Sequence, residues 1–429
     1  MPLGEVVRLV VERDPGVRAL GSERQAAASE AKRTETLRLP KLYLNTDVGA
    51  GKLVNDVSNV LLTGLSPASV TDPTTRSRLA DLSSDRPFVV PGARLENRLF
   101  DGGRTRAAIR SAWLNESKAG VAEARTREDE AFTVASDFLD LAQSRVFSSH
   151  LEDYSRVAGL VAEALDDQVK AGRITEARAL IGQTKLEDAR TAVENNRDDL
   201  RLISNLLRGK AGLPDDAAFD TRSLESRLEE FALSVMPEDS GLDKNATLQT
   251  ALLDTRIQEQ QVKAARGHRL PEIKFVAEYG FAFSSLLFTF RPGYNVGVRA
   301  SYPLFTSREI QRTIQTESRR LEAAAFREAK TRAVLSEEYT RLLAENRKLG
   351  RQHESARSQL AQAEEVYRVA QLKYDQGAGS PDTLLEAAEL LLGSRRRCLE
   401  LTRSSLLLRW SALRFQGKLL AALEREALP

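Results

Sequence analysis

The chain has one cysteine, three histidines and few aromatic residues, and each shortage excludes a class of protein. One cysteine, Cys398, cannot pair within its own chain, so a disulfide scaffold is excluded. The 63 Lys and Arg residues nearly balance the 61 Asp and Glu residues, and no block of five or six basic residues indicates a nucleic-acid surface. No run of 18 apolar residues occurs, which argues against a membrane-spanning helix.

The composition that remains favours long, solvated helices. Charged residues make up 29% of the chain and aromatic residues only 6%, which is unlike a thick globular core. Met1 is followed by Pro2 and an amphipathic run, not by the apolar segment of a secretion signal. If the protein is exported, we expect its leader to lie outside this sequence.

An internal repeat organises the chain. A β-like stretch ending near Phe100 precedes a long charged helical pattern, and a similar stretch ending near Phe305 does the same 205 residues later. The helical pattern breaks at Gly172 in the first half and at Gly377 in the second, again 205 residues apart. We therefore expect the two halves to be built alike.

Each half also has a Leu-Pro step before its first β-like stretch, at Leu39-Pro40 and at Leu270-Pro271. These steps are 231 residues apart, so the additional residues must lie between the first pair of strands. Residues 53–85 are rich in Ser, Thr, Asp, Pro and Gly, and we expect them to form a long exposed loop.

Four β-like stretches alternate between apolar and polar residues, which indicates strands that face two environments. An apolar outer face with charged residues inside is typical of a membrane barrel with a wet lumen, and each stretch has roughly the 9 to 11 residues that a crossing needs. A soluble sandwich with one solvated face is the alternative. The apolar face includes Leu44, Leu95, Leu99, Phe275 and Val298. The candidate lumen residues on the polar face are Asp47, Arg94, Glu96, Lys274, Glu278 and Arg299.

Two proline-free helical patterns of unusual length follow the strands, from Arg104 to Ala171 and from Arg308 to Gln376. At about 1.5 Å per residue each would extend for roughly 100 Å, so each needs packing partners along its whole length. The returning segment of the first half has a heptad pattern, which predicts coiled-coil packing. Its repeated positions are Leu186, Ala189, Val193, Asn196, Leu200, Ile203 and Leu207.

These features together resemble the TolC-type outer-membrane efflux protein family over nearly the whole chain. Their order and their duplicated spacing make the combination specific. The matching segments are Leu3-Gly4-Glu5-Val6-Val7, the two Leu-Pro steps, Leu99-Phe100-Asp101-Gly102-Gly103-Arg104, Tyr302-Pro303-Leu304-Phe305 and the two glycine breaks.

The resemblance implies an α+β membrane protein: a homotrimer in which each chain gives four strands to one 12-stranded β-barrel, continued by a long periplasmic α-helical barrel. Twelve strands can leave a channel, whereas about eight are filled by their own side chains. The implied location is the outer membrane of a Gram-negative bacterium, extending into the periplasm. The implied partners are outer-membrane lipid, a periplasmic adaptor and an inner-membrane transporter, without nucleic acid. No catalysis, cofactor or metal site is expected.

The same resemblance divides the chain into eight expected segments. They are a helix of the α-barrel at 1–39, the first strand pair with its long extracellular loop at 40–101, the first α-barrel hairpin at 102–208, an equatorial segment at 209–244, a helix at 245–270, the second strand pair at 271–305, the second hairpin at 306–416 and a C-terminal equatorial tail at 417–429.

A candidate periplasmic gate follows the second glycine break. Asp382, Glu386 and Glu389 recur at intervals of four and three residues, which places three carboxylates on one helical face. Threefold symmetry would turn each into a ring that attracts cations, whereas an ordinary acidic helix start is the alternative. The resemblance favours a gate and adds Tyr374 to it.

Three positions depart from the family's gate pattern. Gly379 stands where an arginine is expected, and Thr383 and Arg178 stand where aspartates are expected. The closing contacts are therefore expected to differ here. The resemblance implies adaptor contacts at both turns, although glycine there is equally explained by a helix C-cap. The turn residues are Gly172, Arg173, Ile174, Gly377, Ala378 and Gly379.

Two hypotheses of different classes follow, an export channel and a soluble coiled-coil scaffold with a small capping sheet. Within the channel class, the closing segment Trp410-Ser411-Ala412-Leu413-Arg414-Phe415-Gln416-Gly417 favours type I protein secretion over multidrug or metal efflux. His150, His268 and His353 lack the spacing of a metal site, and Cys398 fits a heptad position.

Overall fold

The computed structural model describes residues 1–51, 86–237, 240–284 and 289–426, and gives the backbone alone for 47–51, 86–90, 281–284, 289–292 and 426. The loop expected at 53–85 lies outside the described residues. The chain forms two compact units. The helical unit comprises Met1–Ala26, Glu116–Asp254 and Ala324–Pro429, and the strand unit comprises Ala27–Asn115 and Thr255–Ala323.

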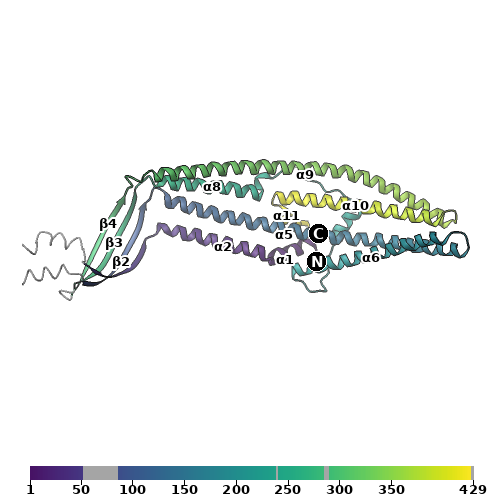
Figure 1. Ribbon diagram of the computed structural model, residues 1–429, viewed down its shortest axis with the longest axis horizontal. Helices are drawn as coiled ribbons and strands as arrows, with labels where there is room; N and C mark the ends of the chain where they lie inside the picture. Colours follow the sequence, from purple (N-terminus) through teal and green to yellow (C-terminus); the bar gives the residue numbers. More distant parts are fainter. Residues whose placement is uncertain (52–85, 238–239, 285–288, 427–429) are drawn as a thin grey trace, which may run out of the picture. The chain divides into compact units, whose positions relative to one another are not determined.

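The strand unit contains one antiparallel sheet in the order β1-β2-β3-β4 (Figure 1). The strands are β1 (Lys41–Gly51), β2 (Arg86–Phe100), β3 (Glu272–Ser284) and β4 (Thr289–Ser301). The four expected strands are therefore confirmed. Within the described part of the chain, β1 and β4 each have a neighbouring strand on one side only.

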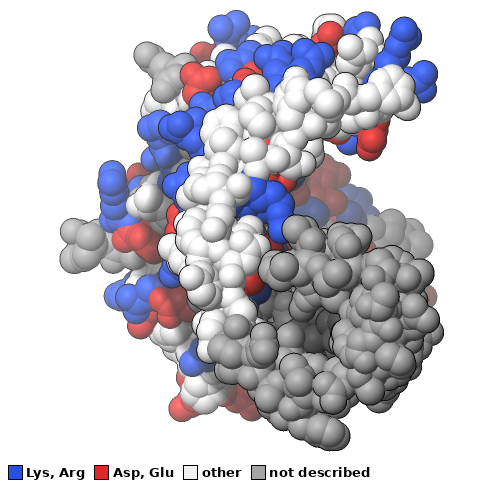
Figure 2. Space-filling model, turned by 90° about the vertical axis from the view of Figure 1, so that its left-hand side faces the viewer, with Lys and Arg blue, Asp and Glu red and all other residues white. Residues whose placement is uncertain are grey.

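The register confirms the separation into an apolar and a polar face. Arg94 of β2 lies opposite Glu278 of β3, while the next residue, Leu95, lies opposite Leu42 of β1 and Ala277 of β3. Because successive residues of a strand point to opposite faces, the charged and the apolar rows separate. Figure 2 views the protein from the side that carries the strands, where uncharged residues form a continuous band over the described surface.

A bulge near the end of β2 shifts its pairing with β3 by one residue. The pairing passes from Arg98, opposite Lys274, to Phe100, opposite Ile273. Leu99 is the extra residue of the bulge, because two residues of β2 here oppose one residue of β3. Phe100 therefore takes the register position opposite Ile273 on the apolar face, next to Leu99, which the alternation predicts for the same face.

The two long helices are confirmed. They are α5 (Arg104–Lys170) and α9 (Glu309–Asp375), each of 67 residues, and both begin in the strand unit and end in the helical unit. The strand unit also contains most of α8 (Ala246–Gly267), the second part of α2 (Pro15–Glu35) and the 3-10 turn η1 (Thr36–Arg38).

In the helical unit, α6 (Glu176–Ala211) returns along α5, and α10 (Pro381–Phe415) returns along α9 (Figure 1). The predicted heptad of α6 is confirmed as its packing face, since Ala189, Val193, Asn196 and Leu207 are buried. Cys398 is fully buried in the corresponding seam between α9 and α10, as its heptad position predicted.

Shorter helices complete this unit. They are α1 (Leu3–Arg13), α7 (Arg222–Glu229), the 3-10 turn η3 (Leu242–Lys244) and α11 (Leu419–Glu426). The sequence pattern had not separated α7 and α11 from the segments around them, because eight-residue helices give too few turns for a periodic signal.

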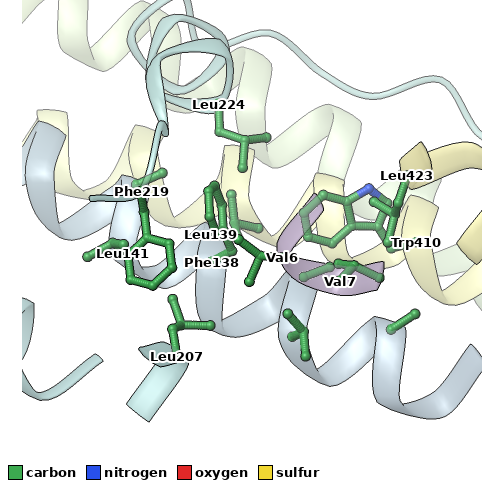
Figure 3. Close-up of a cluster of buried hydrophobic side chains, with 14 of the residues drawn as sticks. Val6, Val7, Phe138, Leu139, Leu141, Leu207, Phe219, Leu224, Trp410 and Leu423 are labelled. Carbon is green, nitrogen blue, oxygen red and sulfur yellow. The ribbon is translucent and has the colours of Figure 1, made fainter. Parts of the chain in front are cut away.

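One apolar core joins these elements. Figure 3 shows Val6 and Val7 of α1 meeting Phe138 of α5 and Trp410 of α10, with contributions from α6, α7 and α11. Trp410 and Phe138 are each 1% exposed, and the ring of Phe138 contacts that of Phe219 edge to face. Burial of each large side chain contributes about 1.5 to 3 kcal/mol, so this core fixes the returning helices against α5.

Candidate channel gate and lumen

The two long helices end in the same turn. Gly172 and Gly377 have φ angles of 68° and 69°, in the left-handed region that glycine adopts without strain. The amide of Gly172 donates to the carbonyl of Val169 at 2.8 Å, and the amide of Arg173 donates to that of Gln168 at 2.9 Å. The amides of Gly377 and of the residue after it repeat these bonds on α9. This is the Schellman pattern, so the expected glycine C-caps are confirmed.

The turn residues differ in exposure. Gly172, Arg173, Gly377 and Ala378 are exposed, whereas Ile174 and Gly379 are half-buried. These positions are available for a contact, and their adaptor role stays a prediction.

Gly379 is required by its surroundings. A Cβ atom there would lie 2.9 Å from the backbone nitrogen of Tyr374 and 3.0 Å from the carbonyl carbon of Lys373. The arginine that the family pattern has at this position would therefore not fit the present turn.

Two of the three candidate gate carboxylates form ion pairs with α6. The Nε atom of Arg178 donates to Oδ2 of Asp382 at 2.6 Å. The Nζ atom of Lys185 lies 2.9 Å from both carboxylate oxygens of Glu389. The hydrogen bond to Glu389 holds the pKa of Lys185 above its usual value. Two ion pairs at different positions along the helices thus link α6 to α10, the returning helices of the two halves.

The other two candidates lie differently. Glu386 is exposed and forms no ion pair within the described part of the chain, and Tyr374 packs half-buried against the apolar cluster of α5, α6, α9 and α10. Sequence reasoning missed Lys185. A signal was available, since Arg178 precedes Asp382 by 204 residues and Lys185 precedes Glu389 by the same interval.

The candidate lumen residues share the polar face of the sheet. Nε of Arg94 lies 2.7 Å from Oε1 of Glu278, an ion pair without hydrogen-bond geometry, and its Nη1 lies 3.7 Å from Glu96. Arg299 is exposed and has no ion pair among the described residues. The side chain of Asp47 lies outside the described ones.

A second charged group centres on Glu272, at the start of β3. Its carboxylate lies 3.2 Å from Nε of Arg98, 3.2 Å from Nη2 of Arg104 and 3.5 Å from Nζ of Lys274. Three cations therefore share one carboxylate where the strands meet the helices. Of this group, only Lys274 is among the candidate lumen residues.

Asp101 explains the Phe-Asp-Gly-Gly phrase that precedes α5. Its Oδ2 accepts hydrogen bonds from the amide and the hydroxyl of Thr105 at 2.7 and 2.6 Å, and its Oδ1 accepts one from the amide of Gly103 at 3.0 Å. Asp101 is 6% exposed. This buried cap satisfies the first amides of α5 and fixes where the strand ends and the helix begins.

The histidines lie apart. His150 lies within 3.3 Å of Arg395 beside a cavity of about 440 Å³ that Tyr154 and Tyr367 also line. His268 contacts Arg104, and His353 is buried on α9. Among the described residues no three His, Cys, Asp or Glu side chains gather as a metal site would require. Every described helix lacks an apolar stretch long enough for a membrane crossing.

This fold, with a four-stranded antiparallel sheet and two long helical hairpins, is shared with outer-membrane channels of known structure. The chain is similar to VceC from Vibrio cholerae, with 17% identity, a TM-score of 0.75 and coverage of 97% of this chain and 96% of that one. It is similar to CusC at 16% identity, a TM-score of 0.77 and coverage of 97% and 92%. It is similar to the CmeC outer membrane channel of Campylobacter jejuni at 16% identity and a TM-score of 0.72, with coverage of 99% of this chain and 89% of that one.

The family described as outer membrane efflux protein matches residues 239–415. The resemblance seen in the sequence is therefore confirmed across the second repeat, and the fold is shared over 97% of the chain. No curated protein sequence matches the chain.

Proposed function

We propose that this protein is the outer-membrane channel of a tripartite export system in a Gram-negative bacterium. In this proposal three copies close one 12-stranded barrel, whose helices extend into the periplasm and dock on an adaptor and an inner-membrane transporter. The chain is a passive, non-enzymatic conduit, and the transporter supplies the energy.

The observation that carries the proposal is the sheet itself. Among the described residues it has two unpaired edges, an apolar face with Leu44 and Tyr294 exposed to 87% and 83%, and a polar face with paired charges. Unpaired edges are normally covered or blocked in soluble proteins, and closure into a barrel removes them. An exposed apolar face is costly in water and stable against lipid.

The gate follows from the same proposal. The Arg178–Asp382 and Lys185–Glu389 pairs link α6 to α10 beside the turns at which α5 and α9 end. In a trimer these links would occur three times around one axis. We infer that they hold the periplasmic end closed and that Glu386, which is exposed, forms the ring of negative charge.

Assembly and lipid exposure test the conduit against the soluble scaffold. A channel should fractionate with the outer membrane and run as a heat-sensitive trimer in detergent. Spin labels at Phe275 and Val298 should report lipid in reconstituted vesicles, and matched labels at Lys274 and Arg299 should report water. A monodisperse monomer that is soluble without detergent would favour the scaffold.

The proposed channel could carry either of two kinds of cargo, secreted proteins or small molecules. The closing segment from Trp410 to Gly417 favours type I protein secretion, whereas the matched family is described as outer membrane efflux protein, which favours the efflux alternative. Trp410 and Gln416 are both buried, so a structural role accounts for these two residues. Deletion of the gene, followed by comparison of the secreted proteins with drug and metal susceptibility, separates the two cargoes. Unchanged secretion would count against type I export.

A further inference from the structure

The first repeat contacts the second within one chain, through the pairing of β2 with β3. The repeat relates β2 to β4 by 205 residues and β3 to β1 by 231 residues. The equivalent contact would join β4 to β1, but these are the two opposite edges of the sheet. One chain therefore cannot make its own second contact, and a second copy can.

The backbone supports this equivalence at the strand-to-helix turns. Gly102 and Gly103 have φ angles of 67° and 83° before α5. Ser307 and Arg308, 205 residues later, have φ angles of 46° and 65° before α9. The second pair holds the same left-handed turn without glycine, so both repeats place the following helix in the same way.

The two turns differ in what covers them. The first is covered by the end of α8, where a Cβ atom on Gly102 would clash with the carbonyl oxygen of Gly267. The second has no such cover among the described residues, and Leu304 and Phe305 are 90% and 87% exposed. Their equivalents Leu99 and Phe100 are less exposed, at 57% and 44%. By the repeat, the missing cover is the segment from the end of α2 to the start of β1 of another copy.

Charge complementarity identifies one contact of that interface. Arg104 pairs with Glu272 at 3.2 Å within the chain. The repeat equivalents of these residues are Glu309 and Lys41, so the charges are exchanged but remain opposite. Glu309 and Lys41 are both exposed, and neither forms an ion pair in the described part of the chain.

In the proposed trimer, β1 of a second copy pairs antiparallel with β4. We propose that this pairing places Ser301 opposite Asn45 and that Glu309 forms an ion pair with Lys41 of that copy. The inference rests on the proposed channel, and it specifies how neighbouring copies of this chain meet. The sheet then continues from one copy to the next in a single register.

The register keeps both faces of the sheet consistent. It places Arg299 opposite Asp47, as Arg94 lies opposite Glu278 within the chain. On the other face it places Ala300 opposite Thr46. A slip by one residue would exchange the two faces and bring charged residues onto the apolar side.

Cysteine cross-linking tests the register. The one native cysteine, Cys398, is fully buried on α10 and far along the chain from the strands, so it should not form cross-links under these conditions. Ser301→Cys combined with Asn45→Cys, and separately Ala300→Cys combined with Thr46→Cys, should give disulfide-linked copies under mild oxidation. Directly opposite residues of antiparallel strands alternate between pairs with Cα atoms about 5.5 Å apart and pairs about 4.5 Å apart, so the two designed pairs sample both spacings.

The matched control is Ser301→Cys with Tyr43→Cys, which corresponds to a slip of two residues on the same face. It should cross-link at least tenfold less than the Asn45 pair. Stronger cross-linking of the Tyr43 pair, or no cross-linking of either designed pair in intact trimers, would overturn the register.

A charge exchange tests the ion pair. Lys41→Glu or Glu309→Lys alone should speed dissociation of the trimer in detergent by roughly threefold, the scale of an exposed ion pair. The double variant should return to within a factor of two of the original protein. Lys32→Glu is the control, because its repeat equivalent Lys263 forms no ion pair among the described residues. Equal rates for the single variants and the control would refute the contact.

These outcomes are separable from the proposed function. An unmodified protein that forms no trimer in the outer membrane contradicts the channel itself. A stable trimer without the designed cross-links, or without charge rescue, leaves the channel standing and refutes only the interface.

Discussion

Arg178 of α6 and Asp382 of α10 lie in direct contact, with Nε of the guanidinium donating to the carboxylate at 2.6 Å. Seven residues further along each helix, Lys185 contacts Glu389. A spacing of seven residues returns to nearly the same helical face, so the two pairs form one charged seam. The family pattern has an aspartate at the position of Arg178, and this chain has a residue of the opposite charge there, which contacts Asp382.

Loss of this seam should open the proposed gate. Exposed ion pairs contribute about 0.2 to 1 kcal/mol each. Arg178→Ala combined with Lys185→Ala should therefore raise the open fraction of channels in planar bilayers severalfold, and high salt should reduce the difference between variant and parent.

Arg190→Ala is the matched control for the gate. Its ion pair with Glu187 lies within α6 and links no second helix. A control that opens the channel as strongly as the double variant would show that charge on α6, not the seam, governs opening.

The glycine caps should be more sensitive to substitution than other helix glycines. At Gly172 a Cβ atom would meet nothing within 4 Å, so Gly172→Ala has only the cost of the left-handed conformation, about 1 kcal/mol. Gly209→Ala, inside α6 and also in open space, should instead stabilise the helix by about 0.5 to 1 kcal/mol. Thermal unfolding followed by circular dichroism measures both. Equal shifts in the same direction would contradict the cap.

The two strand-to-helix turns should respond oppositely to exchange of their residues. Gly102→Ser forces a side chain against the backbone of Gly267 and should destabilise by about 1 to 3 kcal/mol. Ser307→Gly relieves a left-handed serine, and the greater freedom of the unfolded chain offsets part of that gain. It should be neutral or slightly stabilising. Thermal unfolding of both variants provides the test, and a large loss for Ser307→Gly would show that the serine side chain makes a needed contact.

His150 should make the helical unit sensitive to acid. Burial, and then the nearby Arg395 guanidinium, lower the pKa of His150 to about 4. Its unfolded value is near 6.5, so the unfolded state binds more protons between these values and stability falls as the pH drops from about 6.5 toward 4.

His150→Gln should flatten this part of the stability curve relative to the unmodified protein, with the two curves aligned at pH 7.5. Part of the slope should remain, because burial also lowers the pKa of His353. Unfolding by urea at several pH values checks the prediction, and an unchanged slope would contradict it.

The sequence by itself determined the repeat, the strands and the long helices. Alternation at strand spacing and a heptad such as that from Leu186 to Leu207 are local periodic signals, and duplication showed each of them twice. Glycine at 172 and at 377 also predicted the turns, because a left-handed cap is a property of the local backbone.

Only the tertiary structure decided which charged groups meet. The pairing of Lys185 with Glu389 depends on how α6 packs beside α10, and the sharing of Glu272 by three cations depends on the register of β2 against β3. The bulge at Leu99 is likewise a property of two paired strands. These contacts join residues far apart in sequence, and no local period encodes the geometry with which two elements approach each other.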